Sequence, residues 1–326
     1  MRLRLVPQET NFDFFKYRYL TSGLSVVAVI ASLILWAVVG LNFGIDFRGG
    51  TTIRTEAVQP IDVVAYKQAV EALEVGEVLV VEVIDPTREA DTFVGSVRIQ
   101  AQEGQEAATS DTINRALDAL QEVDSTITFQ AVESVGPKVS GELVQAALLA
   151  IAAALAAILI YIWLRFEWQF SIGAVVALFH DVILTIGIFS LLQIRFDLAT
   201  IAAILTIVGY SINDTVVIFD RLRENLRKFK KTPLIEVMNK SVNETLSRTL
   251  MTSGTTLVAL IALLVFGGDV IRGFVFAITW GVIVGTYSSV YVAKNVVLAL
   301  GVKRDWSKSD GNGGGGAGTQ FANVDA

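Results

Sequence analysis

The sequence predicts a mainly α-helical membrane protein with six transmembrane helices and one external α+β domain. Hydrophobic residues make up 53% of the 326 residues and charged residues only 18%, whereas a typical globular domain has about 25% charged residues. Six apolar runs approach the roughly 20 residues that a helix needs to cross a bilayer. Between the first two runs, the hydrophobic pattern alternates between the periods of strands and of helices.

The six predicted spans follow the apolar runs in order. The first run is too long for a signal-peptide core and no small-residue cleavage pattern follows it, so we expect an uncleaved anchor. The fifth run, Leu250–Phe266, is short, and its polar start at Arg248 and Thr249 is therefore counted with the helix. The predicted spans cover residues 20–41, 143–164, 170–192, 198–219, 248–266 and 274–300.

The basic residues of the short connections predict the orientation, because Lys and Arg are enriched on the cytoplasmic side of a membrane. One side of the predicted spans carries sixteen of them, and the other carries only Arg195 and Arg272. We therefore expect both termini to be cytoplasmic. The cytoplasmic parts are residues 1–19, the basic loop 220–247 and a disordered Gly-rich tail at 301–326, and the periplasmic part is residues 42–142.

The external segment reads as a small domain of alternating strands and helices. Pro60 and Asp62 suit the start of a helix, and Ser110 stands where a helix N-cap is expected. The order βαββαβ is that of the ferredoxin-like fold. The predicted strands are Thr51–Ala57, Val78–Ile84, Thr92–Gln100 and Thr126–Val132, and the predicted helices are Ile61–Leu73 and Ser110–Leu120.

Charge is distributed unevenly along the chain. Residues 43–142 carry a net charge of −11 and the remainder +5. The acidic surface keeps the external domain soluble, and contact with an extended client chain is the alternative role. A nucleic-acid-binding domain should show a basic stripe, so no nucleic acid partner is expected. The basic stretch Arg221–Lys231 is expected at the cytoplasmic membrane face, in contact with anionic lipid or with a partner.

The sequence disfavours an enzyme. It has no cysteine and a single histidine, His180, which excludes thiolate chemistry and multi-histidine metal sites within the chain. It also shows neither a Gly-rich phosphate loop before a helix nor a nucleophile elbow. We therefore expect no cofactor and no metal.

Ionisable residues inside the predicted spans are the candidate functional residues, because each costs about 2.5–3.5 kcal/mol in the bilayer core. Asp214 lies inside the fourth span, and Arg248 begins the fifth. An apolar environment disfavours a charge on Asp214, whereas a nearby arginine favours it, so this carboxylate can take up and release a proton. The pair Asp214 and Arg248 is the predicted proton relay.

Helical spacing adds polar residues around this pair. Tyr210 and Ser211 precede Asp214 by four and three residues and so share its face. A stripe of hydroxyl side chains that includes Thr252 begins beside Arg248. The residues predicted to support the relay are Asp181, His180, Tyr210, Ser211, Asn213 and Thr252.

Structural interpretations stand beside these functional ones. Asp214 and Arg248 could form a static pair that fixes helix packing, and His180 with Asp181 could be a hydrogen-bonded unit that bridges helices. Asp220, at the end of the fourth span, is interpreted as a solvated or capping residue. Gly281 and Gly285 form a GxxxG pattern that permits close helix approach.

Several short motifs resemble one known family. Their order along the chain is more specific than any one of them. They are Gly44-Ile45-Asp46-Phe47-Arg48-Gly49-Gly50-Thr51, Val135-Gly136-Pro137-Lys138-Val139, Val208-Gly209-Tyr210-Ser211-Ile212-Asn213-Asp214-Thr215, Asp220-Arg221, Arg223-Glu224-Asn225 and Ser247-Arg248-Thr249. Together they resemble the SecD/SecF family of bacterial protein-export membrane proteins, on its SecF side, up to about residue 305.

The resemblance implies a function that composition does not show. The chain would be the six-span half of an RND-like assembly, with SecD as its obligate partner. It would use protons as the coupling ion to complete preprotein translocation across the inner, cytoplasmic membrane. Asp214 would be the proton-handling carboxylate and Arg248 its basic partner, and Gly49 and Gly50 would serve the turn into the domain. The implied partners are the SecYEG channel, the SecA motor, YajC, the unfolded preprotein client and membrane lipids.

Two other functions remain as alternatives. Half of an RND-type small-molecule exporter would have the same layout, but its external region should be much larger than residues 42–142. A passive scaffold of the translocon would not use protons, and it predicts that Asp214→Asn is tolerated.

Overall fold

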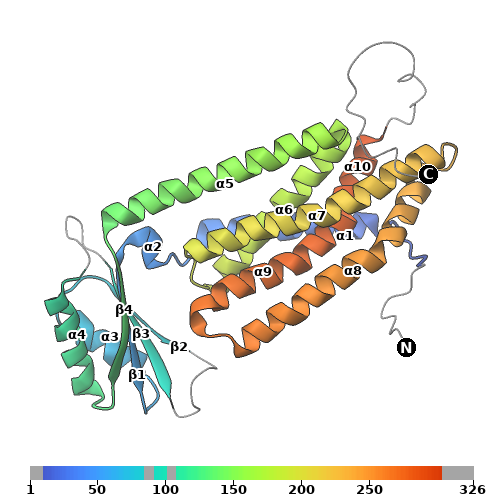
Figure 1. Ribbon diagram of the computed structural model, residues 1–326. Helices are drawn as coiled ribbons and strands as arrows, with labels where there is room; N and C mark the ends of the chain where they lie inside the picture. Colours follow the sequence, from blue (N-terminus) through green and yellow to red (C-terminus); the bar gives the residue numbers. More distant parts are fainter. Residues whose placement is uncertain (1–9, 84–91, 101–107, 303–326) are drawn as a thin grey trace, which may run out of the picture.

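The computed structural model describes residues 10–83, 92–100 and 108–302, which form a long helical bundle and a small α+β domain at one end of it (Figure 1). Six helical segments of this described part are long and apolar enough to cross a membrane. The bundle helices are α1 (Arg18–Val38), α5 (Pro137–Arg165), α6 (Trp168–Leu192), α7 (Leu198–Lys228), α8 (Leu234–Phe266) and α9 (Asp269–Tyr287), which continues through a π-helical turn η1 (Ser288–Ala293) into α10 (Lys294–Leu300).

The external domain has the predicted ferredoxin-like topology. Its antiparallel sheet has the order β2-β3-β1-β4, and two helices cover one face. Asp62, which was predicted to suit a helix start, is the N-cap of the first of these helices, and Thr109 rather than the predicted Ser110 caps the second. The elements are β1 (Gly50–Ala57), α3 (Val63–Glu71), β2 (Val78–Val83), β3 (Phe93–Ile99), α4 (Ser110–Val123) and β4 (Thr128–Val135), preceded by the short α2 (Ile45–Arg48).

The turn from the membrane into this domain depends on two glycines. Gly49 has φ 70° and Gly50 has φ 127°, a region of backbone conformation that side chains disfavour. The predicted role of these glycines in the turn is therefore consistent with the backbone. Ile84 and residues 1–9 and 303–326 lie outside the described residues, so the predicted strand end and the predicted disorder of the tail are not described.

The structure differs from the prediction at the segment 220–247, which was expected to be a loop. Here α7 continues to Lys228 and α8 already begins at Leu234. The helices extend because they carry a shared apolar seam, in which Leu222 and Leu226 belong to the same buried cluster as Val242. The loop was predicted from basic residues. Such residues indicate where a span leaves the apolar layer, but they do not indicate where its helix ends.

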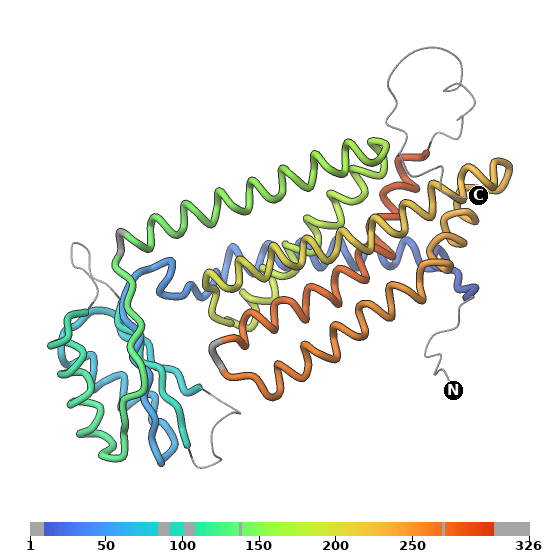
Figure 2. Tube along the Cα trace, viewed as in Figure 1, coloured from blue at the N-terminus to red at the C-terminus, as the bar shows by residue number. Residues whose placement is uncertain are grey.

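The helices α7 and α9 form the centre of the bundle, and α5 runs along its edge (Figure 2). In the most apolar stretch of α5 only 6% of the residues are buried, against 44% in α7. The helices α7 and α9 approach closely at the GxxxG pattern of α9. A Cβ on Gly281 would overlap Ile207 of α7, and a Cβ on Gly285 would lie 3.0 Å from Ser211 Cβ of α7. The predicted close approach is confirmed.

Candidate functional site

A hydrogen-bonded network lies at the centre of the bundle around Asp181 of α6, which is fully buried. Ser211 Oγ of α7 donates to Asp181 Oδ2 over 2.6 Å, and Ser288 Oγ of η1 donates to the same oxygen over 2.8 Å. The second carboxylate oxygen lies 3.0 Å from His180 Nδ1. Asp181 thereby joins three segments of the bundle, as the interpretation of a bridging unit predicts.

The π-helical turn η1 supplies two adjacent serines to two neighbouring helices. Ser288 turns to Asp181 on α6, while Ser289 Oγ lies 2.8 Å from Thr215 Oγ1 on α7 and 3.3 Å from the Ser211 carbonyl oxygen. Single π-helical turns inside α-helices are frequent at functional sites. Sequence reasoning missed both serines, although a Ser-Ser pair in an otherwise apolar span was an available signal.

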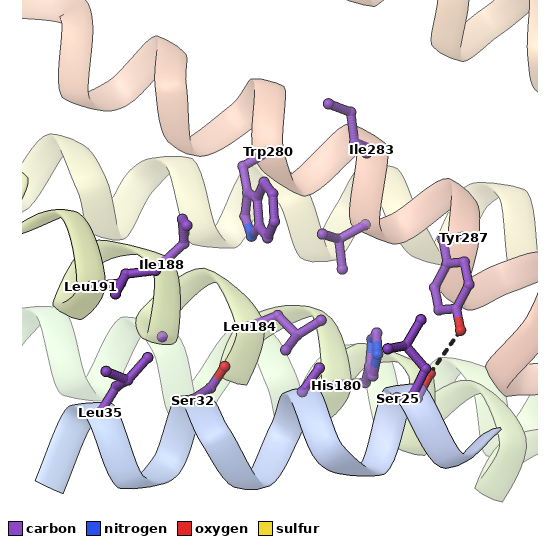
Figure 3. Close-up of a pocket in the computed structure, with 14 residues that line it drawn as sticks. Ser25, Ser32, Leu35, His180, Leu184, Ile188, Leu191, Trp280, Ile283 and Tyr287 are labelled. Atoms are coloured by element: carbon purple, nitrogen blue, oxygen red, sulfur yellow. Dashed lines mark hydrogen bonds between the residues drawn. The ribbon is translucent and has the colours of Figure 1, made fainter. Parts of the chain in front are cut away.

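His180 lies between this network and an apolar groove of about 410 Å³ between α1, α6 and α9 (Figure 3). Its Nε2 atom is buried without a hydrogen-bond partner. Its ring stacks on Tyr287 at 6.1 Å between centroids, and the Tyr287 hydroxyl lies 3.0 Å from Ser25 Oγ (Figure 3). The histidine is therefore held by one hydrogen bond and by ring packing.

Asp214 of α7 is buried in a different way. It is 4% exposed, and its Oδ2 atom is buried without a hydrogen-bond partner. Arg248 of α8 lies close enough for its charge to act on this carboxylate, yet no ion pair within 4.0 Å joins the two side chains. The geometry thus does not show the static salt bridge that the packing interpretation requires.

The predicted supporting residues do not all gather around Asp214. Ser211 bonds to Asp181, and Tyr210 Oη donates to Thr256 Oγ1 of α8 over 3.4 Å. Positions three and four residues before Asp214 lie about 60° and 40° to either side of it around a helix, which directs them to different neighbours. Asn213 is exposed, and Thr252 Oγ1 donates to carbonyls of its own helix.

The end of the bundle away from the sheet carries two further polar contacts. Asp220 accepts bonds of 2.8 and 3.0 Å from Arg165 Nη2, so it is an ion-paired residue and not merely a solvated one. Lys294 of α10, which is 1% exposed, donates to the Phe14 carbonyl over 2.8 Å and lies 3.6 Å from the centre of the Phe15 ring. No sequence pattern pointed to this contact.

The start of α7 is tied to the segment that leads into the external domain. Asp46 Oδ2 accepts a bond of 3.1 Å from the backbone N–H of Leu198, the first residue of α7. The Gly44 N–H donates to the Phe196 carbonyl over 2.7 Å. The helix that carries Asp214 therefore contacts the base of the external domain directly. In the described part of the chain, no three His, Asp or Glu side chains are grouped as a metal site requires.

Comparisons with known proteins identify a family. The model of the C-terminal region of the protein export membrane proteins SecD/SecF matches residues 115–303, and the SecD/SecF GG motif matches residues 34–61. Protein translocase subunit SecF of Cereibacter sphaeroides is 62% identical over 325 residues, covering 100% of this chain and 99% of that protein. The same subunit of Rickettsia bellii is 40% identical over 307 residues, covering 93% and 97%.

Longer relatives match with part of their length. Protein translocase subunit SecDF of Brucella abortus is 39% identical over 303 residues, which cover 93% of this chain and 39% of that protein. The crystal structure of SecDF, a translocon-associated membrane protein from Thermus thermophilus, matches with a TM-score of 0.81 and 34% identity. That match covers 92% of this chain and 40% of the SecDF chain.

These relatives are subunits of a transport machinery and not enzymes. The match of the whole sequence, of both motif regions and of the fold agrees with the resemblance seen in the motifs. The chain therefore belongs to the SecD/SecF family of protein-export membrane proteins, as a multi-pass SecF-type subunit of the protein translocase.

Proposed function

We propose that this subunit works with SecD to use the proton-motive force to complete preprotein translocation across the cytoplasmic membrane. The observation that carries the proposal is Asp214, a carboxylate buried in the central helix α7 with an unpartnered oxygen and with Arg248 nearby. Intramembrane ionisable residues of this kind mark proton paths in pumps and transporters. We assign proton uptake and release to Asp214 and the stabilisation of its charged form to Arg248.

The missing hydrogen bond favours a carboxylate that changes its protonation state. Hydrogen bonds stabilise the charged form of a carboxylate, and Asp214 Oδ2 accepts none. When Asp214 takes up a proton, its attraction to Arg248 is lost and α7 and α8 can shift. One charge crossing 100 mV yields about 2.3 kcal/mol, which biases a conformational equilibrium about fifty-fold.

The connection between Asp46 and Leu198 offers a route from the relay to the external domain. A shift of α7 moves its N-terminal residue, whose N–H is bonded to Asp46. Asp46 belongs to the short helix α2, which leads through Gly49 and Gly50 into β1. The external domain would therefore change its position relative to the bundle when Asp214 changes its charge, and so act on a preprotein at that face.

The exposed side of α7 supports the association with SecD. It presents a stripe of small or short polar side chains, a pattern that permits close helix packing in membranes. A Cβ on Gly209 would meet no atom within 4 Å. The matched region is only 40% of the SecDF chain, and we place the partner half at this exposed face of α7. The exposed stripe consists of Ala199, Ala202, Thr206, Gly209 and Asn213.

The remaining features of the proposal follow from the family and from the distribution of basic residues. The chain would lie in the inner membrane with both termini cytoplasmic and residues 42–142 periplasmic. Its further partners would be the SecYEG channel, the SecA motor, YajC, the unfolded client and anionic lipids, with protons in place of a cofactor.

The test is secretion of a reporter protein in cells that are depleted of the native subunit and supplied with variants. We expect Asp214→Asn and Arg248→Gln to lose secretion while the complex with SecD still purifies intact. Arg248→Lys retains the charge and should retain part of the activity. Normal secretion by Asp214→Asn would show that the subunit is a passive scaffold and would refute the proton role.

A further inference from the structure

A polar crevice of about 320 Å³ lies between the open face of the external sheet and the end of the bundle, where the loop before α7 and the start of α9 line it. Leu79 and Val81 of β2 are directly opposite Arg98 and Ser96 of β3, and all four side chains line the crevice. The helices α3 and α4 cover the other face, where Val80 is buried. The bundle contributes the loop 193–197 and residues 272–273.

Three arginines line this crevice, namely Arg98, Arg195 and Arg272. Arg98 Nη1 donates to the Phe43 carbonyl over 3.2 Å, but its Nε is buried without a partner. Arg195 is paired with Asp197 at 3.3 Å. Arg272 is half-buried and, within the described part of the chain, makes no hydrogen bond or ion pair.

The charges around Arg98 are only partly compensated. Burial lowers the pKa of Arg98, and the nearby charges of Arg195 and Arg48 lower it further. Asp197 and Asp46 oppose this effect but do not outweigh it. An anion in the crevice would offset the repulsion between the guanidinium groups. Planar guanidinium groups match the geometry of a phosphate.

The other wall of the crevice is apolar, and this favours a lipid over a free ion. Leu79 and Val81 are 41% and 46% exposed, and Ile194 also lines the crevice. The crevice lies where α6 ends at Leu192 and close to Arg272 in the first turn of α9. The headgroups of a surrounding bilayer are expected at the ends of the spans. Glu82 and Asp197 also line the crevice, and Asp197 is paired with Arg195, so the preference for anions comes from Arg98 and Arg272.

We propose that this crevice binds the headgroup phosphate of an anionic phospholipid from the leaflet on the side of the external domain. Arg98 and Arg272 donate to the phosphate, and Leu79 and Val81 contact the glycerol and the first methylene groups. The bound lipid would hold the open face of the sheet against the membrane surface. This inference does not depend on the proton role of Asp214.

The full chain, purified in a non-ionic detergent, can be titrated with dioctanoyl phosphatidylglycerol. We expect Arg98→Gln and Arg272→Gln each to weaken binding about tenfold, which corresponds to about 1.4 kcal/mol. Arg115→Gln is the matched control, because it removes the same charge from an exposed position on α4, away from the crevice. It should leave the affinity unchanged.

Three further ligands distinguish the sources of the anion. Dioctanoyl phosphatidylcholine and inorganic phosphate should each bind about tenfold more weakly than phosphatidylglycerol. Equal binding of inorganic phosphate would show a site for a free anion and overturn the lipid proposal. An extended acidic peptide that binds more tightly than the lipid, and loses binding in Arg98→Gln, would identify a client site instead. Equal lipid affinity in wild type, Arg98→Gln and Arg272→Gln would also refute the proposal.

Discussion

Two regions of the bundle bury an aspartate beside the same central helix, α7, and each region faces a different neighbouring helix. Between α6, α7 and η1, Asp181 accepts hydrogen bonds from Ser211 and Ser288. Between α7 and α8, Asp214 is nearly as deeply buried, but its Oδ2 has no partner. A buried polar atom without a partner costs about 1–3 kcal/mol. The first region therefore holds a hydrogen-bonded carboxylate, and the second holds a carboxylate with an unpartnered oxygen, which is the arrangement that the proposed proton role requires.

The largest expected difference between the two regions appears when each carboxylate is replaced by an amide. Asp214→Asn removes the proposed proton site, and we expect reporter secretion to fall by up to about fifty-fold at 100 mV. Asp181→Asn should be tolerated, because its amide oxygen can accept from both serines and its amide nitrogen can donate to His180. Secretion and the amount of SecD complex are measured together. If Asp181→Asn alone abolished secretion, the roles of the two residues would be reversed.

For the free energy of unfolding, we expect the larger effect at Asp181 and the smaller effect at Asp214, the reverse of the order expected for secretion. Asp181→Ala leaves the buried Ser211 hydroxyl without its acceptor, and we expect the free energy of unfolding to fall by about 1–3 kcal/mol. Asp214→Ala should change stability less, since Oδ2 gives up no hydrogen bond. Thermal unfolding of the purified subunit, followed by tryptophan fluorescence, measures both. Equal losses in the two variants would contradict the division into a structural and a functional carboxylate.

Two glycine substitutions distinguish the face of α7 that packs on α9 from its exposed face. Gly281 belongs to α9 and packs on α7, and Gly209 lies on the exposed face of α7. Gly281→Ala would place a Cβ against Ile207, and overpacking of this kind costs about 1–3 kcal/mol. Gly209→Ala meets no atom of this chain, so the isolated subunit should keep its stability while co-purification of SecD falls. If Gly281→Ala instead lost SecD with unchanged thermal stability, SecD would contact α9 near Gly281 and not the exposed face of α7, which contradicts the proposal.

The smallest effect concerns a third buried polar atom, outside the bundle. Tyr66 is 1% exposed, and its hydroxyl lies near the carboxylate of Asp124. Burial, and secondarily the charge of Asp124, raises its pKa from 10.0 to about 12. Because the folded domain favours the neutral phenol, this contribution to stability is complete below pH 10 and is lost as the pH rises towards 12. The tyrosinate absorbance of wild type minus Tyr66→Phe should therefore rise near pH 12, and a midpoint near 10 would contradict the burial.

Much of the fold could be predicted because its signals are local. The lengths of the apolar runs predicted six spans, and the alternation of periods between Thr51 and Val132 predicted the order of the sheet. The loop at 220–247 was wrong because charge reports solvent contact, and a helix whose seam is buried can continue into solvent. The spacing of small residues at Gly281 and Gly285 predicted close packing, but not that α7 is the neighbour.

The candidate site was predictable only in part. Asp214 and Arg248 stood out because a charge within an apolar run needs a reason. Ser288 and Ser289 did not, because the π-helical turn that directs them to two different helices changes the helical period on which sequence reasoning depends. Ser211 was predicted to support Asp214, but its hydroxyl donates to Asp181 of α6. The packing of α6 against α7 decides which of the two carboxylates this hydroxyl contacts.

The sequence by itself determined which segments cross the membrane, which segment folds outside it, and which carboxylates are buried. These properties depend on hydrophobicity and period along a single segment. The tertiary structure alone decided that Asp181 is bonded and Asp214 is not, and that three arginines from three distant positions meet in one crevice. A span that is apolar on all sides has no sequence pattern that indicates which helix it will contact. The partners of its few polar groups are therefore decided by the packing of the bundle.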